Sequence, residues 1–223
     1  MMKDSSFYVN NLNVLYEDNH IIVVEKFINV LSQKDQTNDI DMTDILKAYL
    51  KEKYNKPGNV YLGLIHRLDR RVGGVMVFAK TSKAASRLSE DIRDKNFNKY
   101  YYALVKGVIK EDGKVEVNIL KDEYLKLAKV DSKGKESLLY YKVIKSWDDK
   151  TKLDIDLVTG RYNQIRVSMA YINHPLINDY KYDKDIKPNN LDLGLWCHKV
   201  SLVHPTTKKQ MEFSLEPKGS IWE

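Results

Sequence analysis

Cysteine and long apolar segments are nearly absent from this chain of 223 residues. Cys197 is the only cysteine, so no disulfide can form within the chain, and an oxidising compartment is not indicated. No apolar segment approaches the roughly 20 residues that a membrane-spanning helix needs. The first residues also lack the apolar core of a signal peptide. These absences predict a cytoplasmic protein that does not enter a membrane.

Motifs for metal ions and nucleotide cofactors are missing as well. The five histidines are scattered, and none has a Cys, His or acidic partner at the spacing of a zinc site. The chain has neither a G-x-x-x-x-G-K-[ST] loop nor a G-x-G-x-x-G turn. We therefore expect chemistry that uses side chains alone, without a cofactor or a metal.

The charge balance is basic without being extreme. Lysine and arginine number 37 against 31 acidic residues, which gives a formal net charge of +6 and a pI near 9.0. Hydrophobic residues make up 43% of the chain and aromatic residues 10%, as in an ordinary folded protein. This balance fits a polyanionic partner but does not require one.

Short β-branched segments separated by turn residues predict a protein rich in strands. Residues 13–18 and 20–26 form two such segments around a turn at Asp18 and Asn19. In residues 75–80, VMVFAK, every residue before Lys80 is apolar, which is typical of a strand with both faces covered.

Helical spacing of apolar residues predicts a few helices beside these strands. One is expected over residues 42–54 with Thr43 as N-cap, one after Thr81 or Ser82, and one starting just past Gly160. No repeat or Pro/Gly/Ser linker divides the chain. We predict a single α+β domain over residues 1–223, with a large, bent, mostly antiparallel mixed β-sheet flanked by helices and loops.

The segment from His66 to Thr81, HRLDRRVGGVMVFAKT, places one carboxylate among basic residues. Asp69 is followed by Arg70 and Arg71 and lies close to Arg67. Positive neighbours favour the ionised carboxylate and lower its pKa. Such an anion can attack an electron-poor carbon or stabilise a developing cation. The alternative is a salt-bridged surface loop without a catalytic role.

Two further segments carry residues suited to nucleic-acid chemistry. In TGRYNQIR, a strand that ends at Gly160 and opens a helix predicts an anion site flanked by Arg161 and Arg166. The alternative is a helix cap with exposed arginines. In NKYYYALV, Tyr101 is expected on the opposite face of a strand from its tyrosine neighbours, where it could stack on a base. The alternative is a half-buried core residue.

These segments together resemble the RluA-type RNA pseudouridine synthases. HRLDRRVGGVMVFAKT resembles the family's H-R-L-D-x-x-T-S-G-L-L-L-x-A-K motif, and KYYYALVKG resembles K-x-Y-x-A-L-V-x-G. TGRYNQIRVSMAYINHPLINDYKY resembles T-G-R-x-H-Q-I-R followed by G-H-P-(I/L)-x-G-D-x-x-Y. NVLYEDNHIIVVEK and WCHKVSLVHPTTKKQMEFSLEP resemble the opening and closing segments. Five blocks in order, over nearly the whole chain, are specific where HRLD alone is not.

The resemblance implies an isomerase that converts uridine to pseudouridine in structured RNA and has the pseudouridine synthase fold. Ribosomal RNA is the first expected substrate and transfer RNA the second, so the implied roles are rRNA or tRNA processing. We also expect a monomer. The implied catalytic residues are Asp69, Tyr101 and Arg166; the implied substrate-binding residues are Arg67, Arg70, Ile165, Arg161 and Gln164.

Each implied role follows from the family motifs. Asp69 attacks the base, attacks the ribose, or stabilises a sugar intermediate, and the sequence leaves these three open. Tyr101 is implied to stack on the uracil and to help remove the proton from C5. Arg166 is implied to keep the carboxylate charged and oriented. Ile165 is implied to line the pocket, and Arg67 to fill the space left by the flipped nucleotide.

The chain departs from the family pattern at several loops. K-P-x-G is replaced by KFIN at residues 26–29, T-S-G by Val72 and two glycines, and the histidine of G-R-x-H by Asn163. Asparagine replaces glycine at Asn173 and Asn178. Asparagine tolerates positive φ, so these two changes are conservative for the backbone.

A separate N-terminal RNA-binding module is not expected, because only about a dozen residues precede the first strand. RNA is then gripped by lysine-rich loops such as residues 121–135 and 181–187, whose alternative is a solvated surface without a partner. A silent RNA-binding or RNA-chaperone protein that keeps the fold is the second functional hypothesis. A carboxylate hydrolase ranks last, because HRLDRR holds no second acid.

Overall fold

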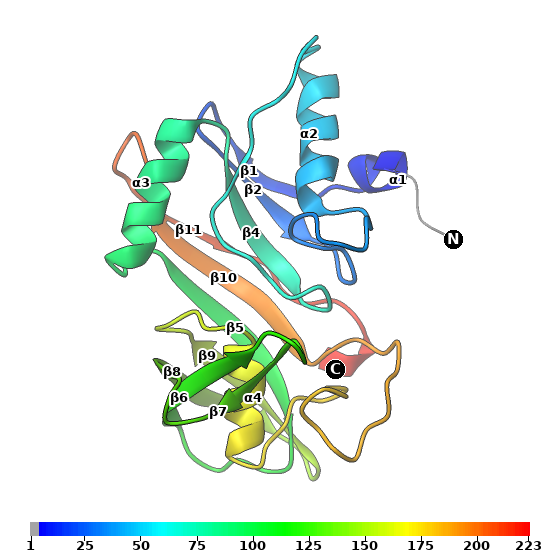
Figure 1. The fold of residues 1–223 in the computed structure, drawn as a ribbon, viewed down its shortest axis with the longest axis vertical. Coiled ribbons are helices and arrows are strands. Elements are labelled where there is room, and N and C mark those ends of the chain that lie inside the picture. Colours follow the sequence, from blue (N-terminus) through cyan, green and yellow to red (C-terminus); the bar gives the residue numbers. More distant parts are fainter. Residues whose placement is uncertain (1–4) are drawn as a thin grey trace. The chain divides into compact units, whose positions relative to one another are not determined.

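The computed structural model describes residues 5–223, which form eleven strands, four α-helices and one short 3₁₀ helix. The chain divides into two compact units (Figure 1). Of the described residues, one unit consists of 5–97 and Lys199–Glu216, the other of Asn98–His198 and Pro217–Glu223. The prediction of a single domain over residues 1–223 stays a prediction. No helix among the described residues is long and apolar enough to cross a membrane.

The first unit combines a sheet with three helices. Its strands are β1 (Val14–Glu17), β2 (Ile21–Lys26), β3 (Gly63–Leu64), β4 (Gly73–Ala79), the Lys199–Val203 part of β10 (Leu195–Val203), and β11 (Gln210–Ser214). Its helices are α1 (Ser5–Asn10), α2 (Met42–Lys53) and α3 (Ser82–Arg93). The pairs β1–β2, β2–β4, β3–β4 and β10–β11 are antiparallel.

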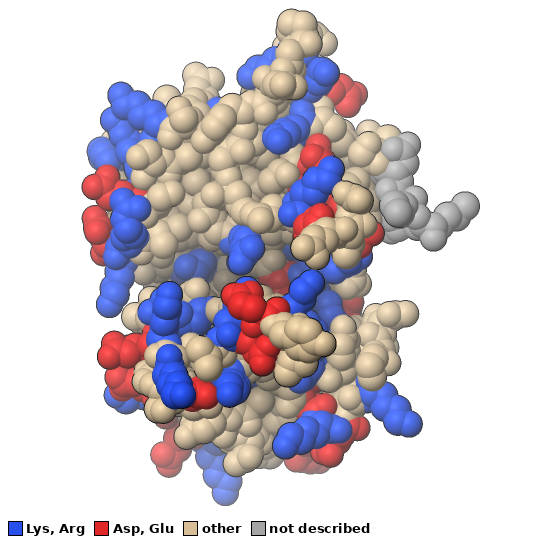
Figure 2. Space-filling model, viewed as in Figure 1, with Lys and Arg blue, Asp and Glu red and all other residues tan. Residues whose placement is uncertain are grey.

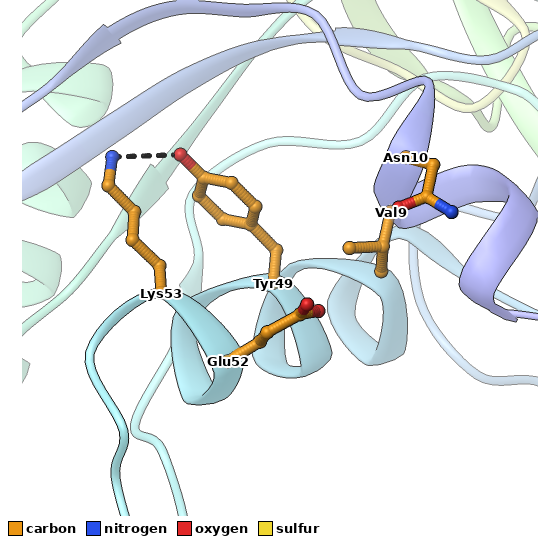
Figure 3. A pocket seen from close by; sticks show the side chains of 5 residues that line it. All are labelled: Val9, Asn10, Tyr49, Glu52 and Lys53. Atoms are coloured by element: carbon orange, nitrogen blue, oxygen red, sulfur yellow. Dashed lines mark hydrogen bonds between the residues drawn. The ribbon is translucent and has the colours of Figure 1, made fainter.

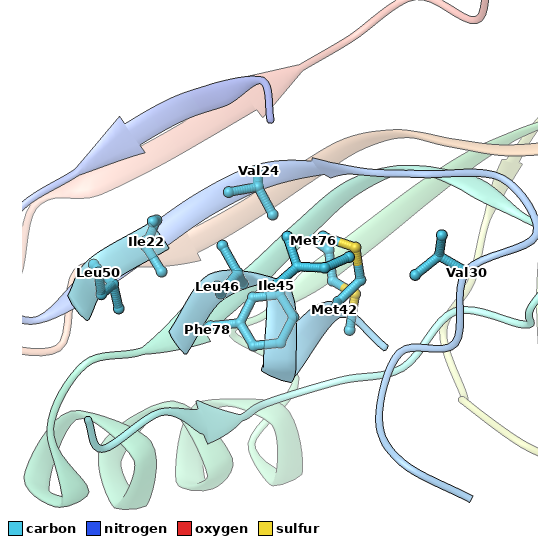
Figure 4. Packing of buried hydrophobic residues seen from close by; sticks show 9 residues of the cluster. All are labelled: Ile22, Val24, Val30, Met42, Ile45, Leu46, Leu50, Met76 and Phe78. Carbon is cyan, nitrogen blue, oxygen red and sulfur yellow. The ribbon is translucent and has the colours of Figure 1, made fainter. Parts of the chain in front are cut away.

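The core of the first unit lies between α2 and the strand pair β2–β4 (Figure 4). Ile22 is opposite Phe78 and Val24 is opposite Met76, so these four side chains share one face. All seven residues of β4 are buried, which confirms the predicted strand with both faces covered. The buried cluster comprises Ile22, Val24, Val30, Met42, Ile45, Leu46, Leu50, Met76 and Phe78.

The start of α2 differs from the prediction. Asp41, not Thr43, is the N-cap, and its Oδ1 accepts the backbone N–H groups of Thr43 at 2.7 Å and Asp44 at 3.1 Å. A carboxylate at this position satisfies two free N–H groups and interacts favourably with the helix dipole. The predicted cap at Thr81 is confirmed, because its Oγ1 accepts the N–H of Ala84.

Glu17 joins β1 to α2 and to the residue after β4. Its carboxylate accepts hydrogen bonds from Lys53 at 2.7 Å, Tyr54 at 2.7 Å and Lys80 at 2.6 Å. Burial raises the pKa of Glu17, but these donors outweigh it and lower the pKa to about 2. Lys53 also donates to the Tyr49 hydroxyl at the edge of a shallow pocket beside α1 and α2 (Figure 3).

The second unit is an antiparallel sheet with one α-helix against it. Its strands are β5 (Asn98–Lys106), β6 (Gly113–Asp122), β7 (Leu127–Val130), β8 (Lys135–Ser146), β9 (Lys150–Asp156) and the Leu195–His198 part of β10. They follow the order β10–β5–β9–β8–β6–β7. Helix α4 (Gln164–Tyr171) packs on β6 and β7, and η1 is Ser220–Trp222. The predicted α+β class with a mostly antiparallel sheet is confirmed.

One predicted loop of the second unit contains a strand. Residues 121–135 were predicted to be a lysine-rich loop, but Leu127–Val130 form β7, which pairs with β6. The hairpin is anchored because Tyr182 accepts the N–H of Ala128 at 2.9 Å and Tyr162 donates to the carbonyl of Lys126 at 3.1 Å. Ala128 is buried against Ile119 and Val167 under α4. Burial of this apolar side chain stabilises the strand that the flanking lysines obscured.

Candidate active site

Asp69 lies in the loop between β3 and β4, and its side chain is half-buried. Its Oδ1 accepts the backbone N–H of Arg71 at 3.1 Å, and its carbonyl accepts the N–H of Val72 at 3.0 Å. An aspartate that accepts the N–H two residues onward forms a compact turn. The turn therefore holds the Asp69 carboxylate through hydrogen bonds within its own loop.

Lys26 holds the Asp69 loop through hydrogen bonds to its backbone. The sequence motifs do not indicate this role. Its ammonium group is fully buried and donates to the carbonyls of Phe27 at 3.0 Å, Arg70 at 3.2 Å and Val72 at 2.8 Å. Three carbonyls match the three donors of an ammonium group. Burial lowers the pKa of Lys26 to about 7, although the negative charge of Asp69 acts in the opposite direction and raises the pKa.

Ser32 holds the loop on the other side of Asp69. Its buried hydroxyl donates to the carbonyl of Leu68 at 2.7 Å and accepts the N–H of the same residue at 3.1 Å. His66 Nε2 accepts the N–H of Val77 on β4 at 3.1 Å. Side chains distant in the sequence thus fix the backbone immediately before and after Asp69.

The arginines around Asp69 do not all direct their charge to it. Arg70 donates from Nη1 to Asp39 at 2.6 Å and from Nε to the carbonyl of Asn29 at 3.2 Å. The sequence predicted that its charge would act on Asp69, whereas its ion pair is with Asp39. Arg67 is exposed on the loop. Substrate binding by Arg67 and Arg70 stays a prediction.

Tyr101 is in the middle of β5 and is 5% exposed. Burial raises its pKa well above the usual value, and the neighbouring Cys197 thiol, to which it is hydrogen-bonded, raises it further. The phenol is therefore neutral at physiological pH. Tyr102 lies on the other face of the strand and stacks on His198 with ring centroids 3.8 Å apart. The predicted opposite orientation of neighbouring tyrosines is confirmed.

The strand register places Tyr101 on the face of the sheet that α4 covers. Tyr101 is opposite Ile155, which in turn is opposite Tyr141. Alternate positions along β8 lead from Tyr141 to Ser137, which is opposite Val117. Val117 belongs to the apolar cluster under α4. Because paired and alternate residues share a face, Tyr101 and the helix with Arg166 are on the same side of the sheet.

Arg166 is buried on α4 and pairs with an acid that the sequence analysis did not select. Its Nε donates to Oδ2 of Asp179 at 2.8 Å and its Nη2 donates to Oδ1 at 2.5 Å. Arg166 is 2% exposed and Asp179 is fully buried. The segment HPLINDYKY contains Asp179, but nothing in its spacing connects this residue to Arg166, 13 residues earlier.

The start of α4 also differs from the prediction. The helix begins at Gln164 rather than just past Gly160, because Asn163 adopts a left-handed conformation with φ of 52°. Gln164 folds back so that its Oε1 accepts from the Thr159 hydroxyl at 2.9 Å and the N–H of Arg161 at 3.0 Å. The amide of Gln164 is thus committed to local hydrogen bonds, and its predicted role in substrate binding stays untested.

Two other predicted substrate residues are near this helix start. Ile165 is 4% exposed on α4. Arg161 is exposed and donates from Nε to the carbonyl of Glu136 at 2.9 Å. Contacts of either residue with RNA stay predictions, as does the anion site at the helix start.

The asparagine substitutions are explained by backbone conformation. Asn173 and Asn178 have φ values of 64° and 62°, which confirms that both positions need the left-handed conformation. Asn29, the last residue of the KFIN segment, has φ of 64° in the same way. In the VGG segment, Gly74 has φ of 119°, a value that other residues rarely adopt. The departures therefore keep the backbone turns of these loops.

The comparison with protein families decides the assignment. A family model described as RNA pseudouridylate synthase matches residues 20–171, which is more than half of the chain. The chain belongs to this family. The match includes Asp69, Tyr101 and Arg166.

Curated relatives agree with this assignment. The ribosomal large subunit pseudouridine synthase C of Buchnera aphidicola subsp. Baizongia pistaciae is 32% identical over 218 residues, covering 92% of this chain and 67% of the relative. The ribosomal large subunit pseudouridine synthase D of Haemophilus influenzae is 31% identical, with 91% and 66% covered. The chain spans about two thirds of the length of these relatives. The resemblance to RluA-type enzymes is confirmed.

Two solved structures share the fold. Human RNA Pseudouridylate Synthase Domain Containing 4 superimposes with a TM-score of 0.79 at 19% identity, covering 95% of this chain and 92% of the other. Human RNA Pseudouridylate Synthase Domain Containing 1 gives 0.75 at 22% identity, covering 94% and 84%. These similarities confirm the predicted pseudouridine synthase fold.

The two units divide the predicted catalytic residues between them. Asp69, Arg67 and Arg70 lie on one loop of the first unit. Tyr101 and Arg166 belong to the second unit, on one side of its sheet. In addition, Lys26 and Ser32 hold the Asp69 loop by hydrogen bonds to its backbone, and Asp179 forms an ion pair with Arg166.

Proposed function

We propose that this chain is an RNA pseudouridine synthase that isomerises uridines of ribosomal RNA, with Asp69 as its essential catalytic residue. Membership of the RNA pseudouridylate synthase family supports the reaction. Relatives named as ribosomal large subunit pseudouridine synthases support the substrate. The observation that carries the proposal is the position of Asp69 on a loop fixed by Lys26 and Ser32.

The reaction needs a group that remains anionic while a glycosidic bond is broken. The bond between N1 of uracil and C1′ of ribose breaks, the base turns, and C5 forms a new bond to C1′. The proton on C5 is lost and N1 takes up a proton, so atoms and charges balance. An ionised Asp69 fits attack on the base, attack on the ribose, or stabilisation of a sugar intermediate. A rigid loop favours any of these, because the carboxylate is held in one geometry.

Tyr101 has properties that suit contact with the base. Its raised pKa keeps the phenol neutral, so it offers an aromatic face and a hydroxyl donor rather than a phenolate base. Stacking on the uracil is therefore the better supported of its two implied roles. Direct removal of the C5 proton requires a phenolate, which burial disfavours.

The remaining residues supply charge and shape. In this proposal Arg166 keeps the catalytic carboxylate charged and oriented, and Ile165 lines the substrate pocket. Arg67 occupies the gap left when the target nucleotide is flipped out of a stem. Arg70, Arg161 and Gln164 contribute to RNA binding.

RNA is gripped by local cationic elements in this proposal. On the face shown in Figure 2, lysine and arginine side chains are interspersed with acidic ones and do not form one continuous basic surface. The β6–β7 hairpin carries Tyr124, which is 94% exposed, and Leu125, which is 61% exposed, next to Lys126. Exposed aromatics beside cations suit unpaired nucleotides. The loop at residues 181–187 stays a second predicted contact.

The test is incubation of the protein with unmodified transcripts of large-subunit ribosomal RNA and of transfer RNA, followed by mapping of pseudouridine. We expect Asp69-dependent product at defined positions of the ribosomal transcript, and none with Asp69→Ala. Product restricted to transfer RNA would contradict the substrate class. Equal product from Asp69→Ala would contradict the mechanism.

The remaining predictions concern the alternative function, the second substrate, the oligomeric state, the location and the cofactor. A silent RNA-binding protein is not favoured, because the family match includes the Asp69 loop. Action on transfer RNA, a monomeric state, a cytoplasmic location and the lack of a cofactor or metal stay predictions.

A further inference from the structure

The guanidinium of Arg166 is held by a two-point contact with Asp179. The Nε–Oδ2 and Nη2–Oδ1 distances are 2.8 and 2.5 Å, and both side chains are buried. Two parallel hydrogen bonds fix the plane of a guanidinium as well as its position. They therefore also fix the direction in which its remaining nitrogen points.

Asp179 is itself immobilised by its own loop. Its Oδ1 also accepts the N–H of Lys181 at 3.2 Å, and its backbone N–H donates to the carbonyl of Leu176 at 3.1 Å. The preceding residue, Asn178, adopts a left-handed conformation and donates from Nδ2 to the carbonyl of Asp192 at 2.8 Å. The carboxylate thus has a fixed position from which to orient Arg166.

Tyr182 limits the guanidinium on a second side. The centre of its ring lies 5.2 Å from Cζ of Arg166. Its hydroxyl accepts the N–H of Ala128 at 2.9 Å and the Nδ2 of Asn163 at 3.1 Å. The ring is therefore anchored to β7 and to the N-cap of α4. A cation beside an aromatic ring gains a favourable electrostatic contact.

Stability alone does not account for this arrangement. A buried ion pair can often be replaced by well-packed apolar residues with little loss or even a gain of stability. Ile165, Val167 and Met169 of α4 are buried, so the helix keeps apolar contact without the pair. What the pair supplies is a guanidinium in one defined orientation.

We propose that Asp179 is a positioning residue of the pseudouridine synthase reaction, which acts by fixing the orientation of Arg166 through this two-point contact. The inference rests on the proposed function, in which Arg166 orients the catalytic carboxylate. Asp179 does not touch the substrate in this scheme. It determines where Arg166 delivers its charge.

The test compares Asp179→Asn and Asp179→Glu with the wild-type protein on a ribosomal RNA transcript. We expect Asp179→Asn to lower the single-turnover rate about 100-fold, since a misplacement of about 1 Å costs that much. RNA affinity is expected to stay within about twofold, because Asp179 is buried away from RNA. Asp179→Glu keeps the charge and shifts it by one methylene, so an intermediate loss is expected.

A double-substitution cycle separates positioning from a general structural effect. If Asp179 acts through Arg166, Arg166→Lys combined with Asp179→Asn will be no slower than the slower single variant. Independent structural damage would instead multiply the two losses. The matched control is Asp41→Asn, a buried acid whose side chain caps α2 in the first unit. Its rate is expected to equal that of the wild type.

Four outcomes overturn the inference. They are a wild-type rate for folded Asp179→Asn, a multiplicative double variant, an equal loss in Asp41→Asn, and a loss confined to RNA affinity. If Asp179→Asn does not fold, a folded Asp179→Glu at the wild-type rate is decisive against it. Failure of the proposed function is distinct, because the wild type would then make no pseudouridine or Asp69→Asn would still make it.

Discussion

Lys26 controls the Asp69 loop through carbonyls that lie 44 and 46 residues away in the chain. Its folded-state pKa of about 7 is below its ordinary value of 10.5. The unfolded chain therefore binds more protons between these two values, and the free energy of unfolding rises as pH increases from about 7 to about 10.5. Below pH 7 the buried charge carries its full cost of burial in the folded protein.

Lys26→Met is expected to abolish this rise and to slow the reaction. The three carbonyls lose their donor, so we expect at least a tenfold lower single-turnover rate, an order of magnitude set by misplacement of a catalytic group. Urea unfolding at pH 7 and pH 9 measures the stability difference, with exposed Lys34→Met as the control. A slope with pH equal to that of the wild type would contradict the pKa assigned to Lys26.

At the residue scale, the sequence predicted what depends on local chemistry. The left-handed conformations of Asn173 and Asn178 were predictable because they follow from the backbone preference of asparagine. The partners of Arg70 and Arg166 were not, because ion pairs with Asp39 and Asp179 depend on how distant segments fold together. The sequence motifs predict functional residues, but they do not indicate the side chains that hold them, such as Asp179 beside Arg166.

At the element scale, Glu17 connects β1 to α2, and this connection depends on pH. The carboxylate has a folded-state pKa of about 2, below its ordinary value of 4.5. A depressed carboxylate pKa stabilises the folded protein above pH 4.5, and this contribution is lost as pH falls from 4.5 to 2.

Glu17→Gln is expected to reduce the free energy of unfolding by about 2 kcal/mol at pH 7. The difference from the wild type will shrink below pH 4.5. Urea unfolding from pH 7 to pH 3 provides the measurement, with the exposed Glu52→Gln on α2 as control. A difference that stays constant over this range would show that Glu17 contributes by packing and not by charge.

Elements with strong periodicity were predictable, whereas weakly apolar ones were not. β4 was predicted because every residue is apolar and buried. β7 was missed because lysines flank its single buried residue, Ala128, and its pairing with β6 creates the burial. α4 starts later than predicted because the side chain of Gln164 and the left-handed Asn163 keep residues 161–163 out of the helix.

At the scale of the whole molecule, we propose that RNA contacts the tip of the β6–β7 hairpin, where Tyr124 and Leu125 are exposed. Tyr124→Ala is expected to weaken RNA binding about tenfold, because stacking on one base contributes roughly 1–3 kcal/mol. Its effect will be independent of salt. Lys126→Glu will instead reduce the dependence of affinity on salt, since a cation near phosphate releases counterions.

Titration of a labelled ribosomal RNA fragment at two salt concentrations measures both effects. Tyr140→Ala, at a half-exposed position on β8, is the control. Unchanged affinity for Tyr124→Ala would remove the hairpin tip from the RNA-binding surface.

The family assignment, the fold and the identity of the motif residues were accessible from five ordered sequence blocks. Asp69 belongs to the first unit, and Tyr101 and Arg166 belong to the second. Within the second unit, the strand register places Tyr101 and the helix of Arg166 on the same side of the sheet.

The central claim is that the ionised carboxylate of Asp69 carries out the isomerisation. It is tested most directly by the tritium released from C5 of uridine-labelled ribosomal RNA under single turnover, with the wild type and Asp69→Asn. The amide keeps the size of the side chain but removes its charge. We expect release with the wild type and none with Asp69→Asn, at unchanged RNA affinity. Release by Asp69→Asn at the wild-type rate would contradict the account.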